Sequence, residues 1–413
     1  MTIDGGGLAT SGASNHFNVQ SGAHLTLSQI ALNKGANLSA CGGSIHVLAN
    51  GQLTLTKVSF DGNTSSYSGG AVCIDANGSA DIHAASFTNN KSGFSGGGGV
   101  FNYGTLSMDH ANFTGNTTSG HGGGLQNYGT GTVSDTTFDH NTADYNGGGI
   151  DTTVTLTVTR GVFTGNYARR KGGGINDYLG TLTVTESSFN GNHADEYGGG
   201  IVNDAGTATI QTSEFSGNTS KGVGGGLRSN GATTVTNSTF SANHSDTNGG
   251  GIENSNTVGT PGTLVLLNTT LAANTASTQG GNIYIGSVTP DHVKLKNTLV
   301  ASGSPNNCDK PVSSQGNNLE SANTCGLNAA GDKNNTSPDL GPLQNNGGPT
   351  ETYALLTGSP AIDAGTNSGC PATDQRGFAR PIDGNWDGVA VCDIGAYEWI
   401  PLKLYIPIVV KPH

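Results

Sequence analysis

The sequence is poor in charged residues and contains no long apolar run. Only 11% of its 413 residues are charged, and it has two Met and two Trp against 68 Gly. Helix formers are scarce and helical periodicity is absent over most of the chain, whereas Thr and Val, which suit strands, are frequent. These absences argue against a helical protein. No stretch is long and apolar enough to span a membrane as a helix.

Positive charge is also scarce. Lys and Arg number 17 against 29 Asp and Glu, which gives a net charge of −12. Nucleic-acid binding needs clustered Lys and Arg, so we expect no nucleic-acid partner. The one basic cluster, Arg169-Arg170-Lys171, is interpreted as a solvated loop.

The six cysteines show no CxxC spacing, so a zinc site is not expected. Four of them form local pairs in the last third of the chain, Cys308 with Cys325 and Cys370 with Cys392. Cys41 and Cys73 lie about one repeat apart, and whether they pair is left open. Disulfides imply an oxidising, extracellular setting. The first residues lead straight into strand-like sequence without a secretion signal, so we expect a processed N-terminus.

A repeat fills most of the chain. Three glycines, an aliphatic residue, a short apolar strand and Phe-x-x-Asn recur every 25 or 26 residues between Gly122 and Asn243. An aliphatic residue precedes each Phe by five positions. Leu271 and Leu299 continue the Phe column, and the aliphatic column slips by one residue before Leu299, where Lys294 takes its place. The two main columns are Phe60, Phe87, Phe113, Phe138, Phe163, Phe189, Phe215 and Phe240, and Asn63, Asn90, Asn116, Asn141, Asn166, Asn192, Asn218 and Asn243.

One repeat cannot bury its own apolar face, but stacked repeats can, because each strand pairs with its equivalents at about 4.8 Å. The sequence therefore predicts an all-β fold, a right-handed parallel β-helix (solenoid) of about 10 to 12 coils. We expect the Phe column to fill the interior and the Asn column to pass amide hydrogen bonds from coil to coil.

Changes in composition predict four regions. Residues 1–40 form irregular N-terminal coils, and residues 41–300 form the regular coils, with insertions at 254–262 and 286–291. Residues 301–399 form the final coils and an irregular, disulfide-containing C-terminal cap, which is needed because an open solenoid end exposes core and strand edges. Residues 400–413 form an apolar strand that either folds back on the cap or is donated to a neighbouring molecule.

The repeats, written GGG[IVL]xNxGTLTVTxSxFxGN, resemble those of bacterial right-handed β-helix proteins of the polymorphic outer-membrane-protein and pectate-lyase-like type. The tail resembles the choice-of-anchor Q domain of secreted bacterial surface proteins. Together the two resemblances cover nearly all of residues 20–399. They imply secretion and surface display, and they bring no known catalytic residue. Glu398 is followed by no sortase motif and no membrane helix, so the anchoring mode stays open. The tail motifs are Asn307-Cys308, Gly316–Leu319, Asn346–Thr350, Gly358–Gly365, Asp374–Pro381 and Cys392–Glu398.

The segment from Asp383 to Gly388 is a candidate calcium loop. Oxygen ligands at alternate positions, Asp383, Asn385 and Asp387, suit a calcium shell, and Asp393 lies one residue before the position of the usual bidentate Glu. The alternative is a metal-free turn held by Cys370 and Cys392. The nearby Asp374, Arg376 and Arg380 are interpreted as an internal ion-pair network.

Three further surfaces are candidates. Asp81, Asp109 and Asp135, with His83 and His110, fall near equivalent places and suggest carbohydrate chemistry, although no paired carboxylates recur within a strand. Outward Thr residues such as Thr157 and Thr159 form a flat face that suits ordered water or ice, or that simply favours strands. Tyr103, Tyr128 and Tyr178 recur about once per coil and either stack on sugars or pack on one another.

The sequence therefore predicts a secreted or cell-surface structural β-solenoid in adhesion, extracellular matrix or a surface layer, not an enzyme. It is expected to assemble with itself through coil ends or the C-terminal strand. The alternative is a β-helix protein that binds or cleaves polysaccharide.

Overall fold

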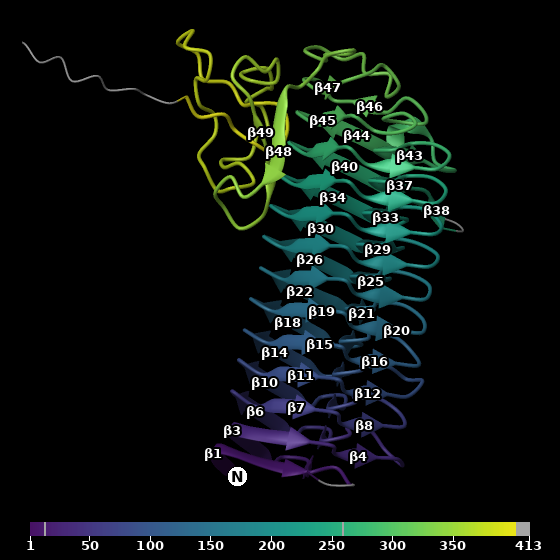
Figure 1. Ribbon diagram of the computed structural model, residues 1–413, viewed down its shortest axis with the longest axis vertical. Helices are drawn as coiled ribbons and strands as arrows, with labels where there is room; N and C mark the ends of the chain where they lie inside the picture. Colours follow the sequence, from purple (N-terminus) through teal and green to yellow (C-terminus); the bar gives the residue numbers. More distant parts are fainter. Residues whose placement is uncertain (12–13, 258–259, 402–413) are drawn as a thin grey trace, which may run out of the picture.

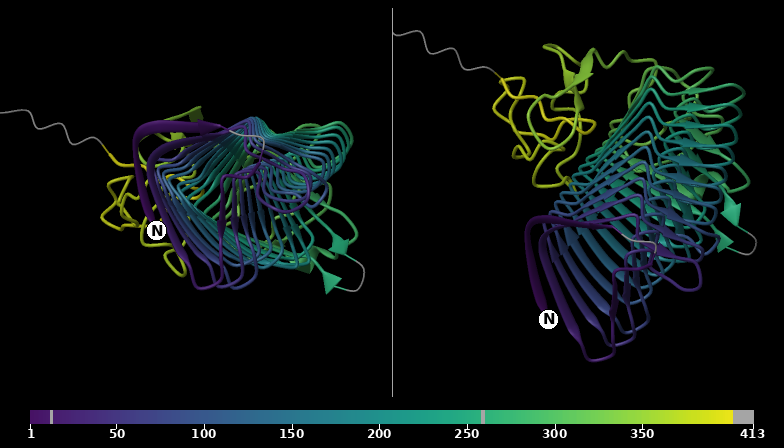
Figure 2. Two further views of the ribbon diagram at one scale, coloured as in Figure 1. Left: turned by 90° about the horizontal axis from the view of Figure 1, so that it is seen from below. Right: turned by 60° about the horizontal axis from the view of Figure 1, so that its bottom comes forward.

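The protein is a solenoid of stacked coils joined by parallel strand pairing (Figure 1). The computed structural model describes residues 1–11, 14–257 and 260–401. Eleven strands, one from each coil, form one of its sheets. The predicted all-β parallel β-helix is thus confirmed. Seen along the axis, the coils superimpose closely (Figure 2).

One coil contains four strands: β22 (Thr155–Thr159), β23 (Val162–Thr164), β24 (Tyr167–Ala168) and β25 (Ile175–Tyr178). Strands of the β22 and β23 type share a bent 24-stranded sheet, those of the β24 type form a 10-stranded sheet, and those of the β25 type form the 11-stranded sheet. Further strands of the β22 type are β6 (Gln52–Thr56), β10 (Ser79–His83), β14 (Thr105–Asp109), β18 (Thr130–Ser134), β26 (Thr181–Thr185), β30 (Thr207–Gln211), β34 (Ala232–Thr236), β40 (Thr263–Leu267) and β44 (Val293–Lys296). Further strands of the β25 type are β9 (Val72–Ile74), β13 (Val100–Asn102), β17 (Leu125–Asn127), β21 (Ile150–Thr152), β29 (Ile201–Asp204), β33 (Leu227–Ser229), β37 (Ile252–Asn254) and β43 (Ile283–Ile285).

The structure places the eight phenylalanines in one continuous interior line. Neighbouring ring centroids lie 4.5 to 4.9 Å apart and the ring planes differ by 1° to 12°. All eight side chains are fully buried. Identical rings therefore fill the core at each level, because parallel in-register pairing puts like residues over like.

The asparagines form a buried ladder beside them. Asn166 Nδ2 donates to Asn192 Oδ1 at 2.9 Å and to the Phe138 carbonyl at 2.8 Å. Its own Oδ1 accepts from the backbone N–H and the Nδ2 of Asn141, both at 3.0 Å. Each amide thus satisfies two backbone groups of the preceding coil, the carbonyl of its Phe and the N–H of its Asn.

The glycine run shapes the turn between β24 and β25. Gly172 has φ of 66°, a region that favours glycine. A Cβ on Gly174 would lie 2.8 Å from the Phe189 ring, and one on Gly173 would lie 2.4 Å from the Gly199 carbonyl. The run recurs because a side chain here would collide with the interior rings or with the next coil.

The register continues without a slip into the last coils. Leu271 of β41 (Thr270–Ala272) is paired with Val300 of β45 (Leu299–Ala301), and Leu266 with Leu295. The interpretation of Leu299 as the interior residue was therefore wrong: Val300 occupies that position, five residues after Leu295. The sequence could not distinguish the two positions, because Leu299 and Val300 are adjacent, both are aliphatic and both are buried.

The two insertions lie outside the coil path. The first is an antiparallel hairpin of β38 (Asn256–Thr257) and β39 (Thr260–Pro261), and the second contains the 3-10 helix η1 (Pro290–His292). A last partial coil follows, in which β46 (Ser313–Ser314) and β47 (Leu319–Glu320) pair with β44 and β45.

The residues after the last coil pack along the flank of the solenoid, where they lie beside its upper coils (Figures 1 and 2). They contain the antiparallel pair β48 (Leu340–Gln344) and β49 (Thr352–Leu355). Side chains of the coils hold them: Ser241 Oγ lies 2.6 Å from the Tyr353 hydroxyl, and Asn237 Nδ2 donates to the Thr373 carbonyl at 2.7 Å. The segment thus covers the β35 (Thr239–Ser241) and β41 edge of the wall.

Three disulfides join Cys41 to Cys73, Cys308 to Cys325 and Cys370 to Cys392. The predicted C-terminal strand lies mostly outside the described residues. Among the described residues, no helix has the length and apolarity to cross a membrane.

Candidate functional site

The candidate calcium loop is closed by its own hydrogen bonds. The Asp383 carboxylate accepts from the backbone N–H groups of Trp386 at 2.8 Å and Gly388 at 3.0 Å. Asn385 Oδ1 and Asp387 Oδ1 each accept from the N–H two residues later, at 2.9 and 2.8 Å. The oxygens are thus gathered in one turn, and calcium binding there stays a prediction.

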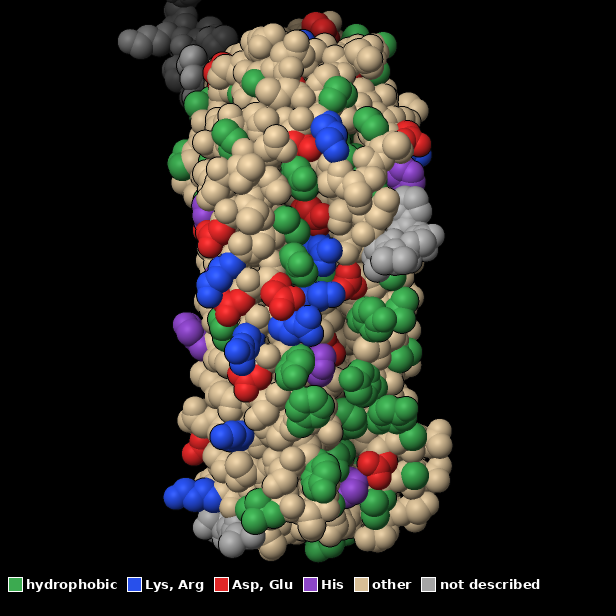
Figure 3. All heavy atoms as spheres, turned by 90° about the vertical axis from the view of Figure 1, so that its right-hand side faces the viewer, with side chains coloured by type: hydrophobic (Ala, Val, Ile, Leu, Met, Phe, Trp, Pro, Cys, Tyr) green, Lys and Arg blue, Asp and Glu red, His purple; other side chains and the backbone are tan. Residues whose placement is uncertain are grey.

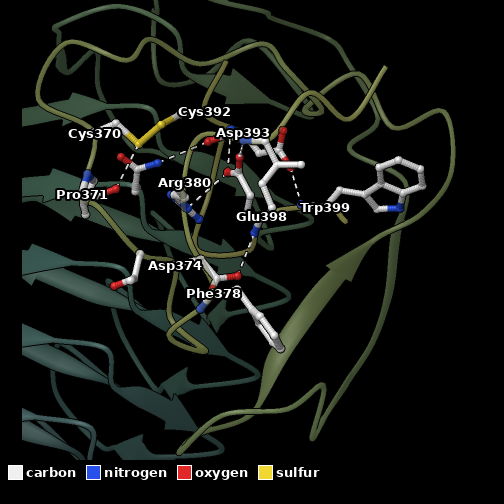
Figure 4. Close-up of polar contacts among 12 residues, drawn as sticks. Cys370, Pro371, Asp374, Phe378, Arg380, Cys392, Asp393, Glu398 and Trp399 are labelled. Atoms are coloured by element: carbon white, nitrogen blue, oxygen red, sulfur yellow. Dashed lines mark hydrogen bonds and ion pairs between the residues drawn. A yellow bond between two sulfur atoms is a disulfide. The ribbon is translucent and has the colours of Figure 1, made fainter. Parts of the chain in front are cut away.

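Asp393 bonds to a different set of groups, and Figure 4 shows it beside Glu398, Arg380 and Trp399. Its carboxylate accepts from the N–H groups of Asp363 at 2.7 Å and Trp399 at 2.5 Å. Burial raises its pKa to about 8. Glu398 accepts from the Asp393 N–H at 3.0 Å and pairs with the buried Arg380 at 3.2 Å. Asp393 therefore links two parts of the C-terminal segment, at Asp363 and Trp399.

The three aspartates proposed as an acidic column occupy three different positions. Asp81 is paired with Ser107 in the middle of the strand, Asp109 ends β14 opposite His83 and Ser134, and Asp135 lies at the corner after β18. Arg160 binds Asp135 through two hydrogen bonds of 2.6 and 2.7 Å. No acidic column forms, because a spacing of 26 or 28 residues does not match the coil length at each level.

The outward threonines do form two columns. Thr132, Thr157, Thr183, Thr209 and Thr234 are paired in register from β18 to β34, and Ser134, Thr159, Thr185, Gln211 and Thr236 form the second column. Ser107 and Asp109 end the array on one side. Binding of ordered water or ice by this face stays a prediction.

Tyr103 and Tyr128 directly follow β13 and β17, and Tyr178 is the last residue of β25. Tyr103 and Tyr128 make an edge-to-face contact at 6.2 Å. Tyr178 lies two coils beyond Tyr128, and the coil between them has Thr153 at this place. The small threonine leaves a depression of about 300 Å³ between the two rings, lined also by His121, Asn146, Asp151, Lys171, Asn176 and Asp204.

The floor of this depression carries charged groups. Asp151 is buried, accepts from Asn176 Nδ2 at 2.8 Å and lies 3.8 Å from His121 Nδ1. Burial raises the pKa of Asp151. Burial also opposes ionisation of Asp204, yet the hydrogen bond and charge of Lys171, with the charge of Arg228, hold the pKa of Asp204 below its usual range. One depression thus contains one carboxyl whose pKa is raised and one whose pKa is lowered.

Lys171 is therefore not the solvated side chain that the sequence suggested. Three-quarters of it is buried, and its Nζ donates to Asp204 Oδ2. Arg228 extends the network, with its Nε 3.2 Å from Glu253 and its guanidinium 4.0 Å above the Tyr197 ring.

A second, more open depression of about 560 Å³ adjoins the first. Its lining includes Phe94, Asp144, Tyr145, Arg170 and Glu196. The Tyr145 ring stacks on His121 of the first depression at 5.3 Å and meets Phe94 edge to face at 5.6 Å. We call the two together the aromatic face.

Charged side chains gather midway along the side of the solenoid shown in Figure 3, next to a band of hydrophobic side chains. The sequence indicated the tyrosines but not Asp151, Asn176 or Asp204. The signal for Asp151 and Asn176 is the residue after the aliphatic position in each β25-type strand, where Gln126, Asp151 and Asn176 are paired in register. Asp204 belongs to another column, in which it is paired with Tyr178.

Comparison with known proteins supports the repeat. Residues 57–75, 135–153 and 186–204 match the Chlamydia polymorphic membrane protein (Chlamydia_PMP) repeat. The predicted likeness to such repeats is confirmed, and the resemblance of the tail to an anchoring domain stays a prediction. The crystal structure of pectate lyase Pel9A matches with a TM-score of 0.40 and 14% identity over 90% of this chain and 88% of that chain. No curated protein matches by sequence.

Proposed function

We propose that this chain is a secreted or surface-displayed β-solenoid that acts in adhesion by binding a polysaccharide along the aromatic face, without cleaving it. The observation that carries the proposal is the pair of adjoining depressions, which combine aromatic rings with amide, carboxylate and cationic groups. Both volumes fall within the range of about 300 to 1,000 Å³ typical of small-ligand sites.

The chemistry of the face suits a sugar polymer. Aromatic rings offer flat apolar surface to sugar rings, and the neighbouring amides and carboxylates accept and donate hydrogen bonds to hydroxyl groups. Tyr178 is half exposed, and its distance of two coils from Tyr128 along the axis is about 10 Å. An extended chain laid along the axis would contact successive coils. The surface-protein repeats are consistent with display at a cell surface.

Binding is tested with a panel of neutral, acidic and amino polysaccharides, measured by calorimetry. Tyr145→Ala removes the ring that joins the two depressions and should weaken binding about fivefold, since stacked aromatics contribute about 1 kcal/mol beyond burial. Trp386→Ala is the control, because it removes an exposed ring from the C-terminal segment on the other flank. Equal losses in both variants, or no saturable binding at all, would remove the proposal.

A specific observation favours cleavage as the second candidate. Burial raises the pKa of Asp151, and Lys171 and Arg228 lower that of Asp204, which is the direction of difference expected between the acid and the second carboxylate in cleavage of glycosides. An enzyme would release cleaved sugar from the bound polysaccharide, and Asp151→Asn and Asp204→Asn would each abolish that release while binding is retained. Absence of product from every bound polysaccharide supports the binding protein.

Self-assembly is a separate proposal. Growth through coil ends or through the C-terminal strand predicts fibres in electron micrographs of the purified protein. If strand donation drives it, a chain without residues 401–413 should remain monomeric, and unchanged fibres would exclude that strand.

A further inference from the structure

Two histidines and an aspartate meet on the outer surface at the corner after β14. His83 ends β10, and in-register pairing places it opposite Asp109, the last residue of β14. His110 follows Asp109 with φ of 52°, and this left-handed turn brings its ring back beside the same carboxylate. Strand pairing and the corner conformation thus bring together three side chains from two coils.

The geometry around Asp109 is convergent. His83 Nδ1 lies 2.9 and 2.8 Å from the two carboxylate oxygens, and His110 Nδ1 lies 2.7 Å from Oδ2. The two imidazole rings are 5.7 Å apart and inclined by 62°. One ligand atom from each residue lies within 4.8 Å of the other two. The three residues are between one-third and two-thirds exposed, so an ion can reach them from solvent.

No charged neighbour in the adjoining described strands, β6 and β18, competes for the side chains of His83, Asp109 and His110. Thr56 flanks His83 and Ser134 flanks Asp109, and both are small and neutral. Asp135, the nearest residue at the same corner one coil on, is bound by Arg160.

We propose that His83, Asp109 and His110 bind a divalent transition-metal ion such as Zn²⁺ or Ni²⁺. Imidazole nitrogen suits these ions, whereas Ca²⁺ and Mg²⁺ take oxygen ligands. Three protein ligands leave further coordination positions open to water or to an outside ligand. Because the ion takes neutral imidazoles, binding releases protons and weakens as the histidines become charged.

A second cluster, Cys41, Cys73, His46 and Asp75, also has ligand atoms within 4.8 Å of one another. Its two sulfurs are joined in a disulfide, so the thiolates that would bind a metal are absent. Measurements without reductant therefore report on the histidine site.

The test is calorimetric titration of the tag-free protein with ZnCl₂ and NiCl₂ at pH 7.5 and at pH 5.5. We expect saturable binding that weakens at the lower pH. His83→Ala and His110→Ala should each weaken it more than about tenfold, because even second-shell changes at metal sites cost 10- to 100-fold.

His140→Ala is the matched control. His140 is somewhat more exposed than His110, also has positive φ and bonds the preceding Asp139 at 2.6 Å, but the pair belongs to no three-residue cluster among the described residues. This variant should bind like the wild type. Circular dichroism confirms that all variants are folded. Wild-type affinity in His83→Ala or His110→Ala, or an equal loss in His140→Ala, would overturn the proposal.

Discussion

Asp177 carries a buried carboxyl whose ionisation should limit stability near neutral pH. It is the third residue of β25, and its Oδ1 accepts from the Gly180 N–H at 3.1 Å while its Oδ2 has no hydrogen-bond partner. Burial raises its pKa to about 7. The same position in other described coils is neutral, as Asn127, Thr152, Asn203, Ser229 and Asn254.

The sign of the effect follows from the two pKa values. Asp177 titrates near 7 in the folded chain and near 3.9 when unfolded, so the folded state holds its proton more tightly. Its contribution to folding is present in full below about pH 4 and is lost as pH rises toward 7. The loss is about 1.4 kcal/mol per pH unit, or about 4 kcal/mol in all.

Asp177→Asn should remove this loss. The amide oxygen keeps the bond to Gly180, as Asn203 Oδ1 does with Gly206 at 3.0 Å. The new amide N–H faces the Thr207 carbonyl, which is the register equivalent of the Ala232 carbonyl bound by Asn203 Nδ2. The variant should match the wild type near pH 4 and exceed it by up to about 4 kcal/mol at pH 8.

The assay is denaturant unfolding of both proteins, followed by circular dichroism at several pH values from 4 to 8. Burial also raises the pKa of Glu214 to about 7 and that of Asp393 to about 8, so only the difference between the two proteins isolates Asp177. Asp81→Asn, which alters an exposed carboxyl, is the control. Two stability curves that stay parallel over the whole pH range would refute the reasoning.

Three further predictions concern the interior and the C-terminal turn. Asn166→Ala should lower the free energy of unfolding by about 3 kcal/mol or more in urea titrations, because it leaves the Phe138 carbonyl and two Asn141 donors unpaired. Phe163→Ala should cost about 3 to 5 kcal/mol in the same assay and Phe163→Leu clearly less, and equal losses would contradict a packed ring column. Calcium titration should give saturable binding that Asp387→Ala removes, and wild-type binding by that variant would exclude the turn.

Much of the fold could be predicted because in-register strand pairing places equivalent residues of successive repeats directly over one another. Once Phe138 and Phe163 are separated by one coil, parallel pairing fixes their stacking and that of the neighbouring Asn141 and Asn166. Regular spacing gave a wrong position where a residue lies one place before or after the true register partner in the neighbouring coil. Asp109 and Asp135 are separated in this way by the corner, and Leu299 took the place of Val300.

The candidate site was harder to predict because it depends on what is missing from a column and on contacts between loops. Thr153 shows as a break in the tyrosine series, yet the hollow it leaves depends on the rings of Tyr128 and Tyr178 on either side. Lys171 looked solvated because its partner, Asp204, is 33 residues away. The flank position of the C-terminal segment depends on single contacts such as Ser241 with Tyr353, which follow no period.

Strand pairing joins each coil only to the coil before it and the coil after it. The number of coils can therefore change without changing the side chains on the outer surfaces of the rod. Inserting one whole repeat between residues 74 and 79 would leave the aromatic face and the contacts of the C-terminal segment intact and would lengthen the rod by about 4.8 Å. If that segment fixes the protein to a surface, the number of N-terminal coils sets how far the rod extends from that surface.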